Sequence, residues 1–453
     1  MKPKTFERTS LAAAFLLLLF ACGLGLAMLL VKVRSAVHLS APIPLPGEGL
    51  SVVLPFGSGW ETLTEWSYEQ DNSFALIATF SPEGAPLAEV RWQYRLAEKP
   101  LSAEELLKQY AVRFSGTVSS IEKFEGQLSF YWLFLFPHAD EERMLLAAAV
   151  PRQGRALLFQ IKGYSDPLYL SELFERLAAR AEFHPDPRRE VSDRLFRDIS
   201  ERLYPQWLQK LQRQPDTFLL YSTAGTPLGY SRTTIPNSAG KLETAIEQEQ
   251  IFRQMELPRT QSRFEASAAL TEFVWTTIRQ IRQRPVQTLL QRLPDGSVQV
   301  EDSYQRRVIC WPLKETVPEI LMPLLARAML DCPQSEAVID IIAPAGQVVP
   351  TLISKKTAEQ AAEPIDRTQY VVKVNFLHHP DNYEEYYFDD QQVLLGRLEM
   401  LPGQSRRLWK TADKVDLNRF LNPPFSKPDQ IVQSPATPMF PAAGQKTESD
   451  SKG

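Results

Sequence analysis

The sequence contains few of the residues that build covalent or metal-held frameworks. It has 3 cysteines and 5 histidines among 453 residues. A disulfide-dense scaffold and an array of zinc fingers are therefore excluded, because each small unit of that kind needs several cysteines of its own. So few histidines also leave little material for histidine-based catalysis.

Neither sign of charge dominates the composition. Lys and Arg number 50, Asp and Glu number 54, and the formal net charge is -4. A protein that binds nucleic acid normally carries a basic excess, so the composition argues against that class. The hydrophobic share of 44% is that of a globular protein with a real core, and the 35 prolines disfavour long uninterrupted helical bundles.

The motifs that hold phosphates, metals or activated nucleophiles are missing from the sequence. We find neither a phosphate-cradling nor a dinucleotide-binding glycine pattern, no metalloprotease helix pair, no nucleophile elbow and no paired CxxC. We therefore predict no catalytic, cofactor-binding or metal-binding residue, and no cofactor.

One long apolar run stands near the N-terminus. Leu11–Val31 carries no charge, and as a helix it would rise about 31 Å, enough to cross a hydrocarbon core of about 30 Å. Three basic residues precede it and two follow: Lys2, Lys4 and Arg8, then Lys32 and Arg34. This bias favours a cytoplasmic N-terminus. We predict that residues 1–35 form a cytoplasmic tip and a single-pass inner-membrane anchor, that residues 11–31 contact the membrane, and that the bulk of the chain is extracytoplasmic.

Two alternatives to this anchor stay open. A signal peptide could be cleaved at Gly25–Ala27, although the apolar run continues beyond that site. Leu19–Cys22 resembles the lipidation motif of lipoproteins, but Phe20 is bulky for the position it occupies.

The next part of the chain alternates between strand and helix patterns. Residues 36–47 hold several prolines and predict an extended spacer. Ala88–Leu96 alternates apolar and polar residues, which predicts a strand with one buried face. Ser102 and Glu105 form a capping box ahead of an apolar helical stripe, and Pro167 opens a second helical pattern. This order is typical of an α+β domain with a mainly antiparallel sheet.

Several of these features match a known family. They are the opening strand before Gly59-Trp60, the Ser102 helix before a strand hairpin, and the closing Leu173–Arg176 helix that leads to Phe183. On these features residues 48–185 resemble the PsbP-like family of small α/β/α sandwich domains. The resemblance implies a non-enzymatic accessory or binding domain, and it transfers no ligand residues.

A helical linker is predicted to join this domain to the second. His184–Arg189 is a charged joint with prolines, and Val191–Gln212 keeps helical spacing, although Pro205 is expected to kink or break the helix. We therefore predict a linker over residues 186–213, with the domain boundary inside it.

The second domain, residues 214–421, is rich in strand patterns. The turn at Ala224–Thr226 predicts a hairpin. Thr316 and Glu319 form a further capping box, which predicts a helix that continues to Met329. Residues 422–453 are rich in proline and end in an almost wholly polar stretch, so we predict a disordered tail.

This domain also carries a resemblance. The residues that support it are Gly225, Leu228-Gly229-Tyr230, Tyr387-Phe388-Asp389 and Val393-Leu394. On them, residues 215–420 resemble the curved antiparallel half-barrels of secreted bacterial proteins, including lipoprotein carriers, in which a sheet wraps a helix or an apolar cavity. The match departs at Gln391-Gln392, where a turn glycine would be expected.

The predicted fold class is therefore α+β: an N-terminal transmembrane helix followed by two mainly antiparallel-sheet domains with packed helices. Cys310 and Cys332 are the cysteines outside the apolar run. We favour two buried thiols, and a disulfide between them stays open.

Three residue groups have side chains that could form chemical sites. His378-His379-Pro380-Asp381 has metal-binding side chains but is typical of a solvated turn. The carboxylates of Glu384, Glu385, Asp389 and Asp390 alternate with aromatic residues or follow them, which predicts that most face water. Ser120 and Lys123 have the spacing of a Ser–Lys pair but lead into a strand.

From the sequence we predict a binding or scaffolding protein of the bacterial envelope without catalytic activity. Its protein partner is not identified by the sequence, and nucleic acid is not expected. Two alternatives stay open: a carrier of an apolar ligand in the second domain, and an envelope hydrolase whose site has no recognised motif.

Overall fold

The computed structural model describes the chain from residue 37 to residue 421, with short internal gaps. The residues outside this description are 1–36, 46, 58, 68–72, 82–87, 97–100, 137–142, 153, 164–166, 223–224, 238–239, 253–258, 282–283, 303–305, 310–315, 379–380, 402–404, 413 and 422–453.

The first domain is built on an eight-stranded antiparallel sheet. Its order is β5-β6-β7-β12-β11-β10-β8, and β9 also pairs with β10. The strands are β5 (Trp60–Ser67), β6 (Ser73–Phe80), β7 (Ala88–Leu96), β8 (Thr117–Val118), β9 (Glu122–Glu125), β10 (Ser129–Phe136), β11 (Arg143–Arg152) and β12 (Arg155–Gly163). The strand predicted at Ala88–Leu96 is β7, with the same bounds.

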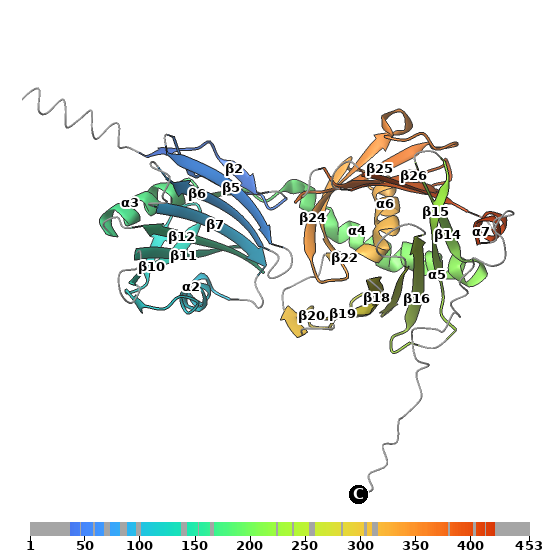
Figure 1. Cartoon of the computed structure of the whole chain (residues 1–453), viewed down its shortest axis with the longest axis horizontal. Helices are drawn as coiled ribbons and strands as arrows, with labels where there is room; N and C mark the ends of the chain where they lie inside the picture. The colour runs from blue at the N-terminus through green and yellow to red at the C-terminus, as the bar shows by residue number, and fades with distance from the viewer. Residues whose placement is uncertain are drawn as a thin grey trace, which may run out of the picture.

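Both faces of this sheet are covered. Helix α2 (Ala103–Ala111) packs on one face and helix α3 (Pro167–Ala178) on the other (Figure 1). Alternate residues of β11 therefore enter different cores: Leu145 packs in the core of α3, and Leu146 packs in the core of α2. The predicted capping box starts α2, because the Glu105 backbone N–H donates to Ser102 Oγ over 3.2 Å.

Smaller strands complete the domain. β2 (Ile43–Leu45), β3 (Leu50–Val52) and β13 (Glu182–Phe183) form a three-stranded sheet, and β1 (His38–Leu39) pairs with β4 (Pro55–Phe56). Part of the predicted spacer thus belongs to this domain, because the prolines at positions 42 and 44 still allow short edge pairings.

The predicted linker contributes to the core of the second domain. α4 (Ser192–Asp198), a π-helical turn η2 (Ile199–Leu203) and α5 (Tyr204–Arg213) follow one another directly. Pro205 lies in the first turn of α5, directly after the π-helical turn, and the chain stays helical on both sides of it, so the proline does not end the segment. The buried side chains of this segment pack with the second sheet and helix α6 (Met322–Asp331).

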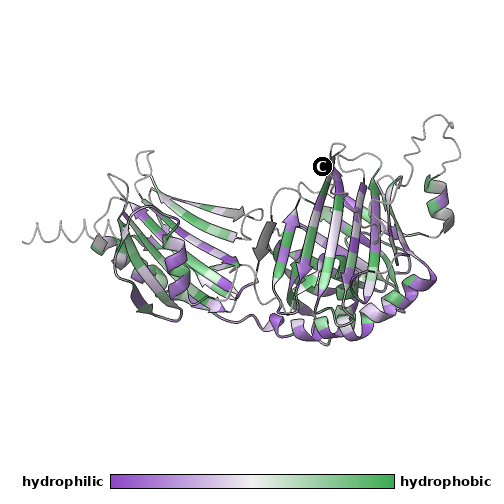
Figure 2. Ribbon diagram, turned by 90° about the horizontal axis from the view of Figure 1, so that it is seen from below, coloured by the Kyte–Doolittle hydropathy of each residue, from purple (hydrophilic) through white to green (hydrophobic). Residues whose placement is uncertain are grey.

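The second domain is one curved sheet of fifteen strands. Its order is β21-β20-β19-β18-β17-β16-β15-β14-β28-β27-β26-β25-β24-β23-β22. The strands are β14 (Asp216–Tyr221), β15 (Pro227–Thr234), β16 (Thr244–Phe252), β17 (Arg259–Ala266), β18 (Phe273–Ile281), β19 (Arg284–Arg292), β20 (Val298–Asp302), β21 (Arg306–Ile309), β22 (Thr316–Pro318), β23 (Glu336–Ile342), β24 (Val348–Thr357), β25 (Tyr370–Phe376), β26 (Tyr383–Phe388), β27 (Leu394–Leu401) and β28 (Ser405–Thr411). Figure 2 shows hydrophobic and hydrophilic residues alternating along many strands of both sheets.

The two ends of this sheet approach each other. β21 and β22 are the end strands, yet they follow one another in the chain. The chain from Ile309 to Thr316 can span at most about 25 Å when fully extended. Gly346, in the turn between β23 and β24, lies so close to Val300 of β20 that an added Cβ would meet the Val300 side chain at 2.4 Å. The sheet therefore curls around the helices.

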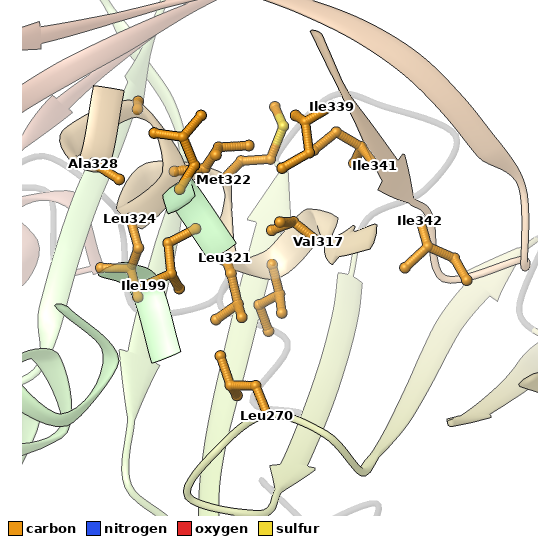
Figure 3. Close-up of a cluster of buried hydrophobic side chains, with 14 of the residues drawn as sticks. Ile199, Leu270, Val317, Leu321, Met322, Leu324, Ala328, Ile339, Ile341 and Ile342 are labelled. Carbon is orange, nitrogen blue, oxygen red and sulfur yellow. The ribbon is translucent and has the colours of Figure 1, made fainter. Parts of the chain in front are cut away.

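The helices fill part of the curve. Side chains of α6, of the turn η3 (Glu319–Leu321) and of the α4–α5 segment pack against the inward faces of the strands (Figure 3). The helix predicted from Thr316 begins later than expected, because Pro318 ends a short strand and Pro323 occupies the first turn of α6.

The two domains are joined by an interdomain ion network of Glu48, Arg152, Arg155, Arg189 and Asp340. Arg155 Nη2 lies 2.5 Å and Arg189 Nη2 lies 3.1 Å from the Asp340 carboxylate on β23, and Arg152 Nη2 lies 3.0 Å from Glu48 Oε2. Burial alone would raise the pKa of Asp340, but Arg189, Arg155 and Arg152 hold it well below its usual range.

The predicted fold class needs correction. Strands make up 53% of the described residues and helices 21%, so the protein is mostly β-sheet, because strand alternation continues through most of the second domain. Within residues 37–421, as far as they are described, no helix has the length and apolarity to span a membrane. The described residues therefore contain nothing that matches the predicted transmembrane helix or single-pass topology. Leu11–Val31 itself lies outside the described residues, and the extracytoplasmic location stays a prediction.

Candidate functional site

The inward face of the second sheet has an apolar part and a charged part. In the apolar part, Cα partners across β16 to β19 place Ile246, Phe264, Trp275 and Leu290 in one row. All four are buried and belong to the core that contains α6. These side chains fill the space between the sheet and the helices, so this part of the interior serves packing.

The charged part begins two residues further along the strands. Tyr386 of β26 faces the same core, and alternation therefore turns Glu384 inward as well. Glu384 is the Cα partner of Glu399 on β27, and Glu399 is the partner of Arg407 on β28. Three neighbouring strands thus bring three charged residues into one inward row.

Three more charged residues lie on the same side. Arg397 precedes Glu399 by two residues on β27 and is the Cα partner of Tyr386. Arg279 follows the inward Trp275 by four residues on β18. Glu319, the first residue of the turn η3, is close enough for its charge to interact with those of Arg279, Arg397 and Glu399. We call the whole set the inward charge cluster: Arg279, Glu319, Glu384, Arg397, Glu399 and Arg407.

Two arginines of the cluster are held by a carboxylate and by aromatic faces. Arg397 Nη2 lies 2.8 Å from Glu399 Oε1, and Arg407 Nη1 lies 3.8 Å from Glu399 Oε2. The Arg397 guanidinium lies 5.1 Å from the ring centroid of Trp409, and that of Arg407 lies 5.4 Å from the ring centroid of Phe252. These contacts fix both guanidinium groups and largely use the charge of Glu399.

Two carboxylates of the cluster lack such a cation. The Tyr386 hydroxyl donates a hydrogen bond to Glu384. Burial raises the pKa of Glu384 to about 7; Arg397 opposes the rise, and the neighbouring charges of Glu399 and Glu319 add to it. Burial also raises the pKa of Glu319, with Arg279 and Arg397 acting in the opposite direction.

Water reaches this part of the interior. The side chains of Glu319 and Arg279 are solvent-exposed, although the surrounding protein still desolvates Glu319 enough to raise its pKa. Within the described part of the chain, neither Glu319 nor Arg279 has a hydrogen-bond or ion-pair partner.

One buried donor lies beside the cluster. Trp409 is 1% exposed, and its Nε1 has no acceptor among the described residues. Its Cα partner on β27 is Arg397. A buried N–H without an acceptor costs free energy. A ligand that supplies an acceptor to Trp409 Nε1 would therefore be bound more tightly.

The acidic residues weighed from the sequence divide between the two faces. Glu385 is turned outward but is buried, and it accepts hydrogen bonds from the Ala362 N–H at 2.8 Å and the Tyr387 hydroxyl at 3.0 Å. The expectation that most of these carboxylates face water fails at Glu385 because the segment after β24 covers the outer face there. Asp389 accepts from the backbone of a turn in which Gln392 takes the left-handed conformation, φ 58°, where a glycine was expected.

The histidine turn and the Ser120–Lys123 pair do not form a site among the described residues. His378 and Asp381 lie in the turn between β25 and β26, whereas His379 and Pro380 lie outside the described residues. No group that could hold a metal is found in the described part of the chain. Lys123 is exposed on β9 and bonds to Glu125 Oε1 at 2.6 Å, so it is not poised to activate Ser120.

Cys332 is described and Cys310 is not. Cys332 is buried with a free thiol, and its Sγ lies 3.0 Å from Gln334 Oε1. The question of a bridge to Cys310 therefore stays a prediction.

Two recesses lie among the helices. One has a volume of about 180 Å³ between α5, α6 and the β26–β27 turn, and Trp207 and Leu324 are in its wall. The other, of about 480 Å³, separates α4 from α6. Its Arg202 is already bound by Asp198 at 2.7 Å and by Asp331 at 2.5 Å. The inward charge cluster is therefore the better candidate, because it keeps charges that have no partner.

Solved structures with a likeness of fold include the following two. A crystal structure of a β-barrel-like protein of a domain of unknown function from Brucella abortus is 12% identical, with a TM-score of 0.32, and the match covers 44% of this chain and 95% of that one. The solution structure of the cyanobacterial PsbP, CyanoP, from Synechocystis is 14% identical, with a TM-score of 0.25, and the match covers 33% of this chain and 95% of that one.

Both likenesses agree with the two weak resemblances noted in the sequence. At these TM-scores they carry no further argument about this protein. No family profile matches the sequence, and no curated protein matches it.

Proposed function

We propose that this chain is a non-catalytic binding protein whose second domain takes a small charged ligand at the inward charge cluster. The observation that carries the proposal is the pair Glu319 and Arg279. They are opposite charges on the inner side of one sheet, both reached by water, and neither has a partner among the described residues. Charged groups kept unpaired on the inward side of a sheet are more typical of a binding site than of a structural ion pair.

The lining favours a polar ligand over the apolar ligand that the sequence left open. An apolar ligand would remove water from six charged side chains and return no hydrogen bond, which is costly. The apolar inward row, which would suit such a ligand, is occupied by the side chains of α6 and of the α4–α5 segment.

A hydrolase is less well supported than a binding protein. Glu384, with a pKa of about 7, has the acidity of a general acid or base. However, its hydrogen bond goes to Tyr386, and the described residues place no activated serine, cysteine or histidine against it. Binding needs only the charges that are present.

The first domain has an accessory role in this proposal. Through Arg155, together with Arg189 of the linker, it binds Asp340 on the outer face of β23, one of the strands of the second sheet. Docking there stiffens the wall of the second domain without entering its interior.

A panel of defined small molecules tests the proposed function. Thermal unfolding of the full chain is measured with spermidine, succinate, inorganic phosphate, phosphoethanolamine, 4-aminobutyrate and palmitate. We expect at least one of the charged compounds to raise the unfolding temperature and palmitate to leave it unchanged.

The double variant Arg279→Gln/Glu319→Gln should lose that rise. The matched control Arg143→Gln/Glu359→Gln, at exposed positions far from the cluster, should keep it. The same response in both variants, or no response to any charged compound, would overturn the proposal.

A further inference from the structure

The charges of the cluster do not cancel pairwise. Glu399 is shared by Arg397 and Arg407, at 2.8 and 3.8 Å. This leaves Glu384 and Glu319 with no cation at ion-pair distance and Arg279 with no anion, as far as the chain is described. The cluster therefore lacks two partners: a positive group for the carboxylates of Glu384 and Glu319, and a negative group for the guanidinium of Arg279.

A primary ammonium can serve as the missing positive partner. It carries three N–H donors and a compact charge, so it can donate to two carboxylates at once. Glu384 and Glu319 suit it, because the charge of Glu319 raises the pKa of Glu384 through repulsion, and a cation between them would remove that repulsion.

An anionic oxygen group can serve as the missing negative partner of Arg279. A guanidinium binds carboxylate or phosphate oxygens through paired N–H donors. The exposed side chain of Arg279 is free to turn toward such a group. The Trp409 Nε1–H, buried on the same inward face and without an acceptor, offers a further donor to ligand oxygens.

We infer that the inward charge cluster selects a zwitterion, with a primary ammonium held between Glu319 and Glu384 and an anionic group held by Arg279. This inference rests on the proposed function, because it names the ligand class of that site. An aminoalkyl phosphate or an amino acid has this chemistry, and so does the phosphoethanolamine headgroup of a lipid.

Binding of such a ligand should release protons near neutral pH. The groups that face Glu384 are Tyr386, Arg397, Glu399 and Glu319. In the empty site part of the Glu384 population is protonated near pH 7, and an ammonium favours the carboxylate form. Affinity for the zwitterion should therefore fall as the pH is lowered from 8 to 6, and the Glu384→Gln variant should lose this dependence.

Isothermal titration calorimetry of the full chain tests the ligand class. The probes are phosphoethanolamine and 4-aminobutyrate as zwitterions, ethanolamine and inorganic phosphate as the separate charges, and phosphocholine, whose quaternary nitrogen has no N–H donor. We expect one zwitterion to bind at least about tenfold more tightly than ethanolamine, phosphate or phosphocholine.

Three variants locate the charges. Glu319→Gln and Arg279→Gln should each weaken the zwitterion by about tenfold or more, since each removes one charge contact, and the exposed control Glu359→Gln should change nothing. Circular dichroism and the unfolding temperature of each variant show that the fold is kept, as expected for side chains without structural partners.

Vesicles distinguish the two sources of the ligand. Flotation with phosphatidylethanolamine vesicles but not with phosphatidylcholine vesicles, competed by free phosphoethanolamine, supports a lipid headgroup. Binding of a free zwitterion without flotation supports a soluble ligand.

The outcomes separate this inference from the proposed function. Ethanolamine or phosphate alone binding as tightly as the zwitterions, with loss in the Arg279→Gln or Glu319→Gln variant, would overturn the zwitterion and leave the binding function standing. Failure of every charged probe would overturn both.

Discussion

The sheets of the two domains use the same period-two alternation but differ in what covers them. In the first domain α2 and α3 cover opposite faces, and the inward side chains of β11 are buried on both sides. In the second domain one continuous sheet curls around its helices, which fill only part of the curve. Alternation alone therefore gives a closed core where a helix covers the whole face, and a row of inward charged residues where the apolar core around the helices ends.

The largest effect is expected from breaking the closed core. Phe174 of α3 is fully buried, and its ring lies 5.3 Å from that of Phe159 and 5.8 Å from that of Trp132, centroid to centroid. Phe174→Ala should lower the free energy of unfolding by about 3–5 kcal/mol, because it leaves a cavity. Hydrogen exchange of β11 and β12 peptides measures this change within the first domain.

Leu168 is the matched control on the same helix. It is 72% exposed, so Leu168→Ala should leave the exchange of these peptides nearly unchanged. Equal effects of the two substitutions would contradict the view that α3 seals this face.

A smaller effect is expected from separating the two domains. Asp340→Asn removes the charge that Arg155 and Arg189 share and should destabilise the chain by about 3 kcal/mol, because the buried guanidinium groups then rely on the more distant carboxylate of Glu48. Trypsin should then cut faster in the joint at His184–Arg189. The exposed Asp366→Asn serves as control, and identical digestion of the two variants would show that the network does not hold the domains together.

The pH dependence of this contribution has a definite sign. The folded pKa of Asp340 is lowered, so its stabilisation is fully present above the unfolded pKa of about 4 and is lost as the pH falls from there through the folded pKa. The difference in stability between the wild type and Asp340→Asn should therefore shrink in acid.

The smallest effect is expected at the inward charge cluster. The folded pKa of Glu384 is raised to about 7, so the folded state binds a proton that the unfolded state has released above its pKa of about 4. The free energy of unfolding of the wild type should fall by about 2 kcal/mol between pH 4 and 7, a value reduced to allow for solvent screening near Glu384. Glu384→Gln should remove this slope in urea unfolding between pH 4 and 8, and an unchanged slope would place the titration elsewhere.

Local signals predicted local structure well. The alternation at Ala88–Leu96 and the capping box of Ser102 and Glu105 are decided by neighbouring residues, and the structure contains both. The helix expected from Thr316 shows the limit of this reasoning, since Pro318 inside the capping pattern and Pro323 after it moved its start to Met322.

The candidate site could not be predicted from the sequence. Alternation correctly separates Glu384 from Glu385, but it does not say which face is inside or what covers the other one. Glu399 and Arg407 approach Glu384 only through pairing of β26, β27 and β28, and Arg279 comes from a strand far away in the sheet order. The curvature that brings these strands together depends on long-range pairing, which no local pattern encodes.

The pairing of β14 with β28 also constrains how the chain is completed during synthesis. Phe218, in the first strand of the second domain, has Thr411, in the last strand, as its Cα partner. The first domain has all of its paired strands by Phe183 and can fold as soon as that point leaves the ribosome. The second sheet must wait with one edge of β14 open until β28 emerges, so the step that joins them should be slow and should be the stage at which nascent chains most readily aggregate.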